Sequence, residues 1–508
     1  MTGGSNNRRI AKNTVLLYIR TIIVLFVSLY TSRLILKALG AEDLGIYNVV
    51  AGIVALMAFF RTSLSKATSR FITYELGKKG NAQSLSRIFS SAMTIHIIIS
   101  VIAVILGETL GIFILEHWTD IPEIRHQAAF WIFQCALVIF CLQIMTSPYE
   151  SILIAHENMS VFAYMSILSA LLKLGVVFLL LGSSSDRLIL YGVLMVAMDA
   201  LILLVYVLYD KRKYPNFRFR FLWDKDYSRR IFAFSGWTLL GSSANGATQQ
   251  GVSLLFNNFV GLIANTALGF ANQVNAAVAQ FVNSFQTAFN PQIIKLYAQG
   301  ELGEMHLLMS RASKFSFVLS YVLALPLIAN MDFVLKIWLG DVPQYTVEFC
   351  QLILVCCVID SITGVFNTAI TATGNIKGFQ IGISCSFILD LITAAVLLLL
   401  HLHPALVFGS RILTRGLINM VIELHFVKKQ LLFNLTEYVF TVIIPILITL
   451  FVTILLVCVI SKYYDGETKL FITSVISAAC LLLFGYTLFL NKDERKKIVS
   501  LILARIRK

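Results

Sequence analysis

Charged side chains inside otherwise apolar stretches are the residues of this chain whose types and positions could do chemistry. Each costs about 2.5–3.5 kcal/mol at the centre of a membrane-spanning helix, so each needs a partner, water or a ligand. They are Arg20, Arg33, Arg61, Lys173 and Asp199 in the first half, with Lys66 at a cytoplasmic edge, and Asp360, Asp390, Arg411, Arg415 and Glu423 in the second. Within a membrane, such residues support ion binding, proton transfer and the attraction of a charged ligand.

The charged group of the second half has two interpretations. Counting at about 1.5 Å per residue places Asp360, Asp390 and Arg415 near the middle of their helices, with Arg411 a turn further outward. Arg411 and Arg415 are four residues apart and are expected to share one face. The group either holds three helices together as a charge-balanced cluster, or it is a site where a carboxylate near an arginine exchanges a proton or Na⁺.

The basic residues of the first half also have two interpretations. Arg20, Arg61 and Lys66 could extend toward the aqueous interface, whereas Arg33 reaches the outer half of its helix. Alternatively, these residues make one wall of a cavity cationic and attract an anionic headgroup. Lys173 and Asp199 are more simply explained as an ion pair.

A second set of polar residues follows two consecutive helices predicted over Ile231–Gln299 and joined at Val260–Ala264. This stretch has no formal charge before Lys295 and is too polar to face lipid. Each helix carries a polar stripe, about 80° wide on the first and about 60° wide on the second. The stripes contain Thr238, Ser242, Asn245, Gln249 and Ser253, then Asn265, Asn272, Asn283, Gln286 and Asn290, flanked by Asn275 and Gln280. Such amides can be helix–helix contacts worth about 0.6 kcal/mol each, but stripes of this length favour a wet or ligand-filled cavity.

The composition places these residues in a membrane protein. Of 508 residues, 58% are hydrophobic and 13% are charged, and the mean hydropathy is +0.81, which excludes an ordinary soluble protein. We count about fourteen apolar stretches near the required length of about 20 residues. They cover residues 14–36, 44–64, 87–107, 124–146, 159–182, 188–209, 231–257, 264–289, 315–338, 347–372, 379–401, 404–427, 438–460 and 469–490. The predicted fold class is an all-α integral membrane protein.

The positions of lysine and arginine predict the orientation in the membrane. The N-terminus, the loops after the second and sixth spans and the C-terminal tail are basic, whereas the intervening loops are poor in lysine and arginine. The least clear loop is Ser147–Asn158, which contains Glu150 and Glu157. Both termini are expected in the cytoplasm, and the net charge of +14 is expected to face anionic lipid rather than nucleic acid. The eight cysteines have no metal-ligand spacing and are expected to be small core residues.

The chain contains an internal duplication. Leu44–Val50 recurs as Leu268–Val274 in the form L-G-x-x-N-x-V, 224 residues later, and Ser86-Arg87 recurs at the same offset as Ser310-Arg311. Two copies of about six spans predict two pseudo-symmetric lobes. The expected domains are an N-terminal lobe over 1–209, a basic linker over 210–230, a C-terminal lobe over 231–430, and two further helices with a basic tail over 431–508.

Several motifs resemble a known family. The segments Asn7–Thr14, Tyr30–Arg33, Leu39–Asn48 and Ala155–Met159 are similar to bacterial polysaccharide and O-antigen flippases. These belong to the multidrug/oligosaccharidyl-lipid/polysaccharide (MOP) superfamily, which also contains MATE-type multidrug exporters. The resemblance implies a MATE-like fold, with two lobes that rock around a central cavity lined by spans one, two, seven and eight. It also implies movement of oligosaccharides linked to undecaprenyl pyrophosphate from the cytoplasmic to the outer leaflet of the inner membrane.

The resemblance also implies roles for the polar residues. Basic side chains would bind the pyrophosphate and amides would bind the sugar hydroxyls; the expected residues are Arg20, Arg33, Arg61, Lys66, Asn245, Gln249, Asn272, Asn283, Gln286 and Asn290. The expected ion-coupling or structural charge cluster is Asp360, Asp390, Arg411 and Arg415. No cofactor or metal is expected, and a proton or Na⁺ gradient would drive transport. The expected partners are membrane lipid, the lipid-linked oligosaccharide and proteins of polysaccharide polymerisation and assembly, with the chain itself monomeric.

Two other functions fit parts of the sequence. A multidrug exporter of the same fold would bind cationic drugs through acidic cavity residues, whereas the four spans assigned to the cavity contain Arg20, Arg33 and Arg61 and no mid-span carboxylate. A membrane glycan polymerase or ligase normally carries catalytic residues on a sizeable outer loop, and no outer loop here exceeds roughly twenty residues. The sequence has no nucleophile triad, phosphate-binding loop or dinucleotide fingerprint, so an enzyme is not expected.

Overall fold

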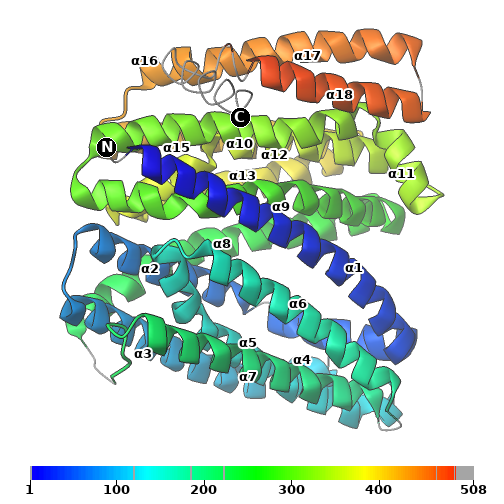
Figure 1. Ribbon diagram of the computed structural model, residues 1–508. Helices are drawn as coiled ribbons and strands as arrows, with labels where there is room; N and C mark the ends of the chain where they lie inside the picture. Colours follow the sequence, from blue (N-terminus) through cyan, green and yellow to red (C-terminus); the bar gives the residue numbers. More distant parts are fainter. Residues whose placement is uncertain are drawn as a thin grey trace, which may run out of the picture. The chain divides into compact units, whose positions relative to one another are not determined.

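The computed structural model describes residues 3–55, 57–117, 121–183, 186–220, 224–464, 466–484 and 487, and within these ranges all regular structure is helical (Figure 1). The predicted all-α fold class is therefore confirmed. The basic tail expected at the C-terminus lies outside the described residues. The chain forms two compact units: unit 1 comprises Met1–Ser243 and Ile294–Gln299, and unit 2 comprises Ala244–Ile293 and Gly300–Lys508.

Unit 1 is organised around one central helix. Its elements are α1 (Gly3–Ala55), α2 (Ala58–Gly77), α3 (Ala82–Leu106), η1 (Gly107–Gly111), α4 (Ile112–His117), η2 (Glu123–Arg125), α5 (His126–Ala155), α6 (Met159–Leu181), α7 (Arg187–Lys213), the start of α8 (Lys225–Phe259) and the end of α9 (Leu262–Gln299). Helix α5 packs against α2, α3 and α7, while α1 packs against α6. Phe133 and Ile144 of α5 are fully buried in one cluster with Val50 of α1 and Leu188 of α7. The apolar residues of α5 thus hold the other helices of this unit together.

Gly40 interrupts α1 and separates the first two predicted spans. Its φ of 79° lies in the region that favours glycine, because a side chain there would clash with the backbone. Just beyond this kink Asp43 forms an ion pair with Arg125, which also contacts the helix-capping residue Asp186 at 2.7 Å. These contacts join α1, η2 and the start of α7 at one end of the unit.

Two of the predicted boundaries in this unit are wrong. The second span, predicted over 44–64, is a bent pair in which Glu42–Val54 and Ala58–Gly77 form an angle of 51°. The predicted loop Ser147–Asn158 is helical through Ala155, because the buried residues Ile152 and Leu153 extend the packed face of α5 by two turns. Glu150 therefore lies on a helix rather than in a loop.

Unit 2 contains the remaining parts of α8 and α9 and a second set of long helices. They are α10 (Leu302–Ala329), α11 (Met331–Leu339), α12 (Thr346–Thr373), α13 (Lys377–Leu399), α14 (Ala405–Arg411), η3 (Ile412–Leu417), α15 (Ile418–Leu431), α16 (Leu435–Tyr438), η4 (Val439–Ile443), α17 (Ile444–Tyr463) and α18 (Gly466–Phe484). Helix α10 packs against α12 and α18, and α18 runs beside α17 (Figure 1). The core of this unit is aromatic: Phe349 lies 5.3 Å from Phe256 and 4.6 Å from Phe408, measured between ring centroids.

The helices have the length and composition of membrane spans. Ten described helices are long and apolar enough to cross a membrane, and the bent pair makes an eleventh. The two predicted spans over Ile231–Gln299 are also helical, as α8 and α9. Large apolar side chains such as Phe26 and Phe451 are 68% and 67% exposed, as expected of surfaces that lipid covers. The chain is therefore a multi-pass membrane protein.

Candidate functional site

Arg61 of α2 is the centre of a polar network in unit 1. Its Nη1 donates a hydrogen bond to Oε1 of Gln143 at 3.2 Å, and its Nη2 lies 3.8 Å from Oε2 of Glu150. Gln143 Nε2 in turn donates to Oδ2 of Asp199 on α7 at 3.4 Å. The network therefore joins three helices through side chains that the apolar spans would otherwise exclude. Its outer part is accessible, since the side chain of Arg61 is 37% exposed.

Asp199 does not form the ion pair that the sequence predicted. We expected an ion pair between Asp199 and Lys173, but Lys173 interacts with it only at longer range, and the direct contact of Asp199 is with Gln143. Two further members of the network, Gln143 and Glu150, were not predicted from the sequence. A glutamine in an apolar span was the available signal for Gln143, whereas Glu150 was hidden by the wrong loop boundary.

The other predicted basic residues of unit 1 fall into two groups. The half-buried Arg20 places its guanidinium over the ring of Phe162, 5.4 Å from the centroid, and lies within electrostatic range of Glu150. By contrast, Arg33 and Lys66 are exposed, and neither forms a hydrogen bond or ion pair with another described residue. Arg33 and Lys66 are therefore available to an anionic ligand, while Arg20 and Arg61 are partly neutralised by acidic neighbours.

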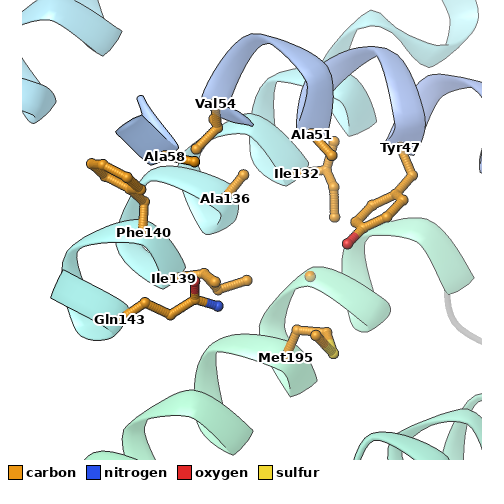
Figure 2. Close-up of a pocket in the computed structure, with 11 residues that line it drawn as sticks. Tyr47, Ala51, Val54, Ala58, Ile132, Ala136, Ile139, Phe140, Gln143 and Met195 are labelled. Carbon is orange, nitrogen blue, oxygen red and sulfur yellow. The ribbon is translucent and has the colours of Figure 1, made fainter. Parts of the chain in front are cut away.

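One member of the network, Gln143, also lines an apolar cavity, whose lining residues are drawn in Figure 2. Its volume is about 180 Å³, and its walls come from α1, α2, α5 and α7. The polar groups among its lining residues are the Tyr47 hydroxyl and the Gln143 amide; the rest are apolar side chains such as Val54, Ile132 and Met195. The cavity accordingly suits a small hydrophobic group rather than a charged one.

The motif Ala155–Met159 joins the ends of several helices in unit 1. The Glu157 carboxylate is 1% exposed and accepts a hydrogen bond from Lys295 Nζ at 2.6 Å, while its backbone carbonyl accepts one from Asn13 Nδ2 at 3.2 Å. Asn158 Nδ2 donates to the Tyr209 hydroxyl at 2.9 Å. Beside them His156 packs against aromatic rings, and burial lowers the pKa of its imidazole. This motif therefore fixes the ends of several helices and has no visible role in binding a ligand.

The polar stripes of α8 and α9 differ in exposure along unit 2. Gln249, Asn272 and Asn283 are exposed, whereas Asn245, Gln286 and Asn290 are half-buried. Asn245 Oδ1 accepts hydrogen bonds from Gln249 Nε2 at 3.4 Å and from Arg415 Nη2 at 2.8 Å. The stripe of α8 is therefore connected to the predicted charge cluster.

The charge cluster of unit 2 separates into a buried pair and an exposed acid. Asp390 and Arg411, with side chains 2% and 9% exposed, form an ion pair of 3.2 Å. Asp390 Oδ1 also accepts a hydrogen bond from Thr414 Oγ1 at 2.9 Å. Asp360 of α12 is exposed and forms no hydrogen bond or ion pair with a described residue, although Arg411 and Arg415 lie within electrostatic range.

Arg411 and Arg415 have different partners, although α-helical spacing predicted one shared face. The backbone between them is the π-helix η3, whose wider turn changes the direction of side chains four residues apart. Arg411 binds Asp390 of α13, whereas Arg415 binds Asn245 of α8 and lies over the ring of Phe387, 4.7 Å from its centroid. With the π-helix between them, one guanidinium group contacts α13 and the other contacts α8.

Gln286 lies beside the same face of α12 as Asp360. A Cβ atom at Gly364 would come within 2.5 Å of Gln286 Nε2, so the absent side chain at Gly364 makes room for this amide. Gly364 is four residues after Asp360 and hence one turn away on the same face. The structure thus brings an amide of α9 close to the turn that carries the exposed carboxylate.

Comparisons with known proteins agree with this architecture. Residues 10–297 match the family model described as polysaccharide biosynthesis protein. No curated protein matches the chain in sequence. Among solved structures, an outward-facing multidrug-resistance MATE transporter of the MOP superfamily has a TM-score of 0.71 at 11% identity, covering 83% of this chain and 94% of the other.

Two further structures extend the comparison of the fold. A MATE transporter from Vibrio cholerae has a TM-score of 0.65 at 14% identity, with 84% of this chain and 97% of that chain covered. A MOP superfamily transporter from Pyrococcus furiosus, described as having a binding pocket of reversed polarity, has a TM-score of 0.66 at 13% identity, with coverages of 82% and 95%. These similarities confirm the predicted MATE-like fold.

Proposed function

This chain belongs to the polysaccharide biosynthesis protein family, and we propose that it is a flippase for lipid-linked oligosaccharides. The substrate would be an oligosaccharide on undecaprenyl pyrophosphate, which the protein moves from the cytoplasmic to the outer leaflet of the bacterial inner membrane. The reaction is transport by alternating access and makes or breaks no covalent bond. Both termini would be cytoplasmic, as the distribution of lysine and arginine predicts.

The observation that carries this proposal is the pair of exposed basic side chains in unit 1. Arg33 and Lys66 lie on apolar helices, are exposed, and have no hydrogen-bonding or ion-pairing partner among the described residues. Leaving a cation in that position is costly unless water or an anion accompanies it. Guanidinium and ammonium groups each bind phosphate groups strongly. Arg61 would add a partly exposed third cation.

The exposed amides of unit 2 suit the neutral part of the same substrate. Gln249, Asn272 and Asn283 present both donors and acceptors without a charge. Sugar hydroxyls also donate and accept, so these side chains can exchange hydrogen bonds with successive sugars.

Asp360 is the residue that we propose for ion coupling. It is exposed in an otherwise apolar helix and has no direct partner, so a proton or Na⁺ could bind it without displacing an existing contact. Asp390 is less suited, because its two oxygens are already bonded to Arg411 and Thr414.

The test is transport in liposomes that contain the purified chain and a fluorescent lipid-linked oligosaccharide. We expect the labelled lipid to change leaflet under an imposed proton or Na⁺ gradient. Arg33→Gln and Lys66→Gln should slow transport at least tenfold, whereas Arg33→Lys should retain part of it. Lys429→Gln, at an exposed lysine near the end of α15, is the matched control. Unchanged transport in both glutamine variants would refute the role of these cations.

A multidrug exporter is the second candidate, and exposed Asp360 is the observation that favours it. A lone carboxylate can bind a cationic drug as readily as a coupling ion. If this function holds, the chain should protect a drug-sensitive host, Asp360→Asn should abolish protection, and Arg33→Gln should leave it unchanged. New glycosidic bonds formed by the purified chain without a gradient would instead indicate a glycan polymerase or ligase.

A further inference from the structure

The buried carboxyl group of Glu423 takes no part in the site described above. Glu423 lies on α15 of unit 2 and is 6% exposed. Its Oε2 atom is buried and has no hydrogen-bond partner among the described residues. The hydroxyl of Thr363 on α12 is hydrogen-bonded to the carboxyl group. Ionising a carboxyl group this deeply buried is costly when a hydroxyl is its partner, so the group keeps its proton.

The carboxyl group of Glu423 has another acid near it. Asp360 of α12 lies within electrostatic range, as does the Tyr438 hydroxyl at the end of α16. A negative charge on Asp360 would repel one on Glu423, so ionising both acids at once is unfavourable. The other acidic and basic residues of α15 and of the elements that pack on it are Glu348 of α12, Lys377 and Asp390 of α13, Arg415 of η3, and His425, Lys428 and Lys429 of α15 itself.

The acid at the equivalent position of unit 1 has different neighbours. The predicted duplication relates Glu423 to Asp199 of α7, 224 residues earlier. Asp199 accepts a hydrogen bond from Gln143 and has two cations, Arg61 and Lys173, within electrostatic range. By contrast, Glu423 has a hydroxyl and a second acid near it. The surroundings of Asp199 suit an ionised carboxylate, whereas those of Glu423 suit a neutral acid that can release and accept a proton.

Glu423 lies beyond Asp360 toward one end of unit 2. Its partner Thr363 is three residues, or about 4.5 Å, further along α12 than Asp360. The distribution of lysine and arginine predicts that this end of α12 is cytoplasmic. Asp360 is exposed near the middle of the same helix. The two acids are therefore successive positions in one direction, from the middle of the helix toward its cytoplasmic end.

A cavity continues this direction beyond Glu423. Tyr438 lines a cavity of about 380 Å³ between the start of α10 and residues 433–441, which has room for about a dozen waters. The Tyr438 hydroxyl is bonded to Ser313 Oγ at 2.7 Å, and Ser313 donates to the carbonyl of Ile362, the residue before Thr363. Tyr438 thus lies between the buried acid and a space that can hold water. The acidic and basic residues that line this cavity are His306, Arg311, Lys314 and Glu437.

We propose that Glu423 carries the coupling proton between Asp360 and water in this cavity. The inference rests on the proposed function, in which Asp360 binds the coupling ion, and it identifies that ion as a proton. Glu423 releases its proton to cavity water past Tyr438 and then takes the proton held by Asp360, so each acid returns to its starting state. A hard metal cation needs several oxygen ligands, whereas the unpartnered Oε2 of Glu423 suits a proton.

The first experiment asks whether Glu423 holds a proton, by infrared difference spectroscopy of the purified full-length protein at about pH 7. The spectrum of the wild type minus that of Glu423→Gln should contain the carbonyl band of a protonated carboxyl group. Thr363→Val should shift the frequency of that band, because it removes the hydrogen bond and keeps the shape of the side chain. Glu467→Gln, at an exposed carboxylate of α18, is the matched control and should leave the band unchanged.

The second experiment follows coupling in liposomes that contain the labelled lipid-linked oligosaccharide. A proton gradient should drive transport by the wild type and by Glu467→Gln. Glu423→Gln should reduce proton-driven transport at least about tenfold, because glutamine has the shape of the neutral acid and cannot release a proton. The movement of the labelled lipid without a gradient should be unchanged in this variant.

Three results would overturn the proposal. They are the absence of a carboxyl band from Glu423, full proton-driven transport in Glu423→Gln, and transport that only a Na⁺ gradient drives. If Glu423→Gln fails to fold, the band in Thr363→Val decides the outcome, and an unshifted band counts against the proposal. The infrared measurement needs no oligosaccharide substrate. A wild-type chain that shows the Glu423 band but transports no oligosaccharide would therefore refute the proposed function and still support the proton site.

Discussion

Asp390→Asn should destabilise the protein far more than Asp360→Asn, although both substitutions remove one carboxylate charge from consecutive helices of unit 2. Asp390 has a side chain 2% exposed and is paired with Arg411 at 3.2 Å. Removing one partner of such a buried pair leaves the other charge uncompensated and costs about 3–5 kcal/mol. Asp360 is exposed and without a direct partner, so its substitution should change stability by less than about 0.5 kcal/mol.

These free energies correspond to a large difference in thermal stability. For a unit of this size, about 3–5 kcal/mol corresponds to a fall in melting temperature of about 6–20 °C. We would measure unfolding of each purified variant in the same detergent, using a dye that reacts with cysteines as they become exposed. The double variant with Arg411→Gln adds a second check, since paired residues should show a coupling energy of about 1–3 kcal/mol.

The transport assay completes the comparison. Asp360→Asn should keep the wild-type melting temperature and lose gradient-dependent transport. Asp390→Asn should instead lower the melting temperature. The reasoning is refuted if Asp390→Asn melts like the wild type while transport is lost. That result would make Asp390 the coupling residue and remove the structural role that its contacts assign to it.

Three further predictions concern other parts of the chain. Glu157→Gln should lower the free energy of unfolding by about 1–3 kcal/mol, because it weakens a buried contact to Lys295. The loss is limited because Lys295 keeps some access to water. Thermal unfolding measures it. Burial lowers the pKa of His156 below its ordinary value of 6.5. The contribution of the neutral imidazole to stability is therefore complete above about pH 6.5 and is lost as the pH falls. In His156→Gln the melting temperature should accordingly vary less with pH between about pH 5 and 7. Gly77→Ala should destabilise by about 1–3 kcal/mol, since the new Cβ would lie 2.9 Å from a backbone atom. Gly364→Ala should cost less than about 1 kcal/mol, because it meets only the end of a flexible side chain; equal melting of the two glycine variants would contradict this explanation.

Much of the architecture followed from the sequence alone. Apolar stretches of sufficient length predicted a membrane protein built of many helices, because hydropathy is a local property that adds along the chain. The polarity of α8 and α9 and the list of charged residues inside spans were also readable without coordinates. The break at Gly40 separates the first two spans that the hydropathy pattern predicts.

Tertiary structure decided which charged residues have partners. Arg61 and Gln143 are 82 positions apart, and Arg415 and Asn245 are 170 apart, so neither contact has a local signature. A rotation of one residue about a helix axis turns a side chain by about 100°, which is enough to exchange one partner for another. For that reason the sequence could list Asp360 and Asp390 as equivalent acids, whereas packing made one a buried structural residue and left the other accessible.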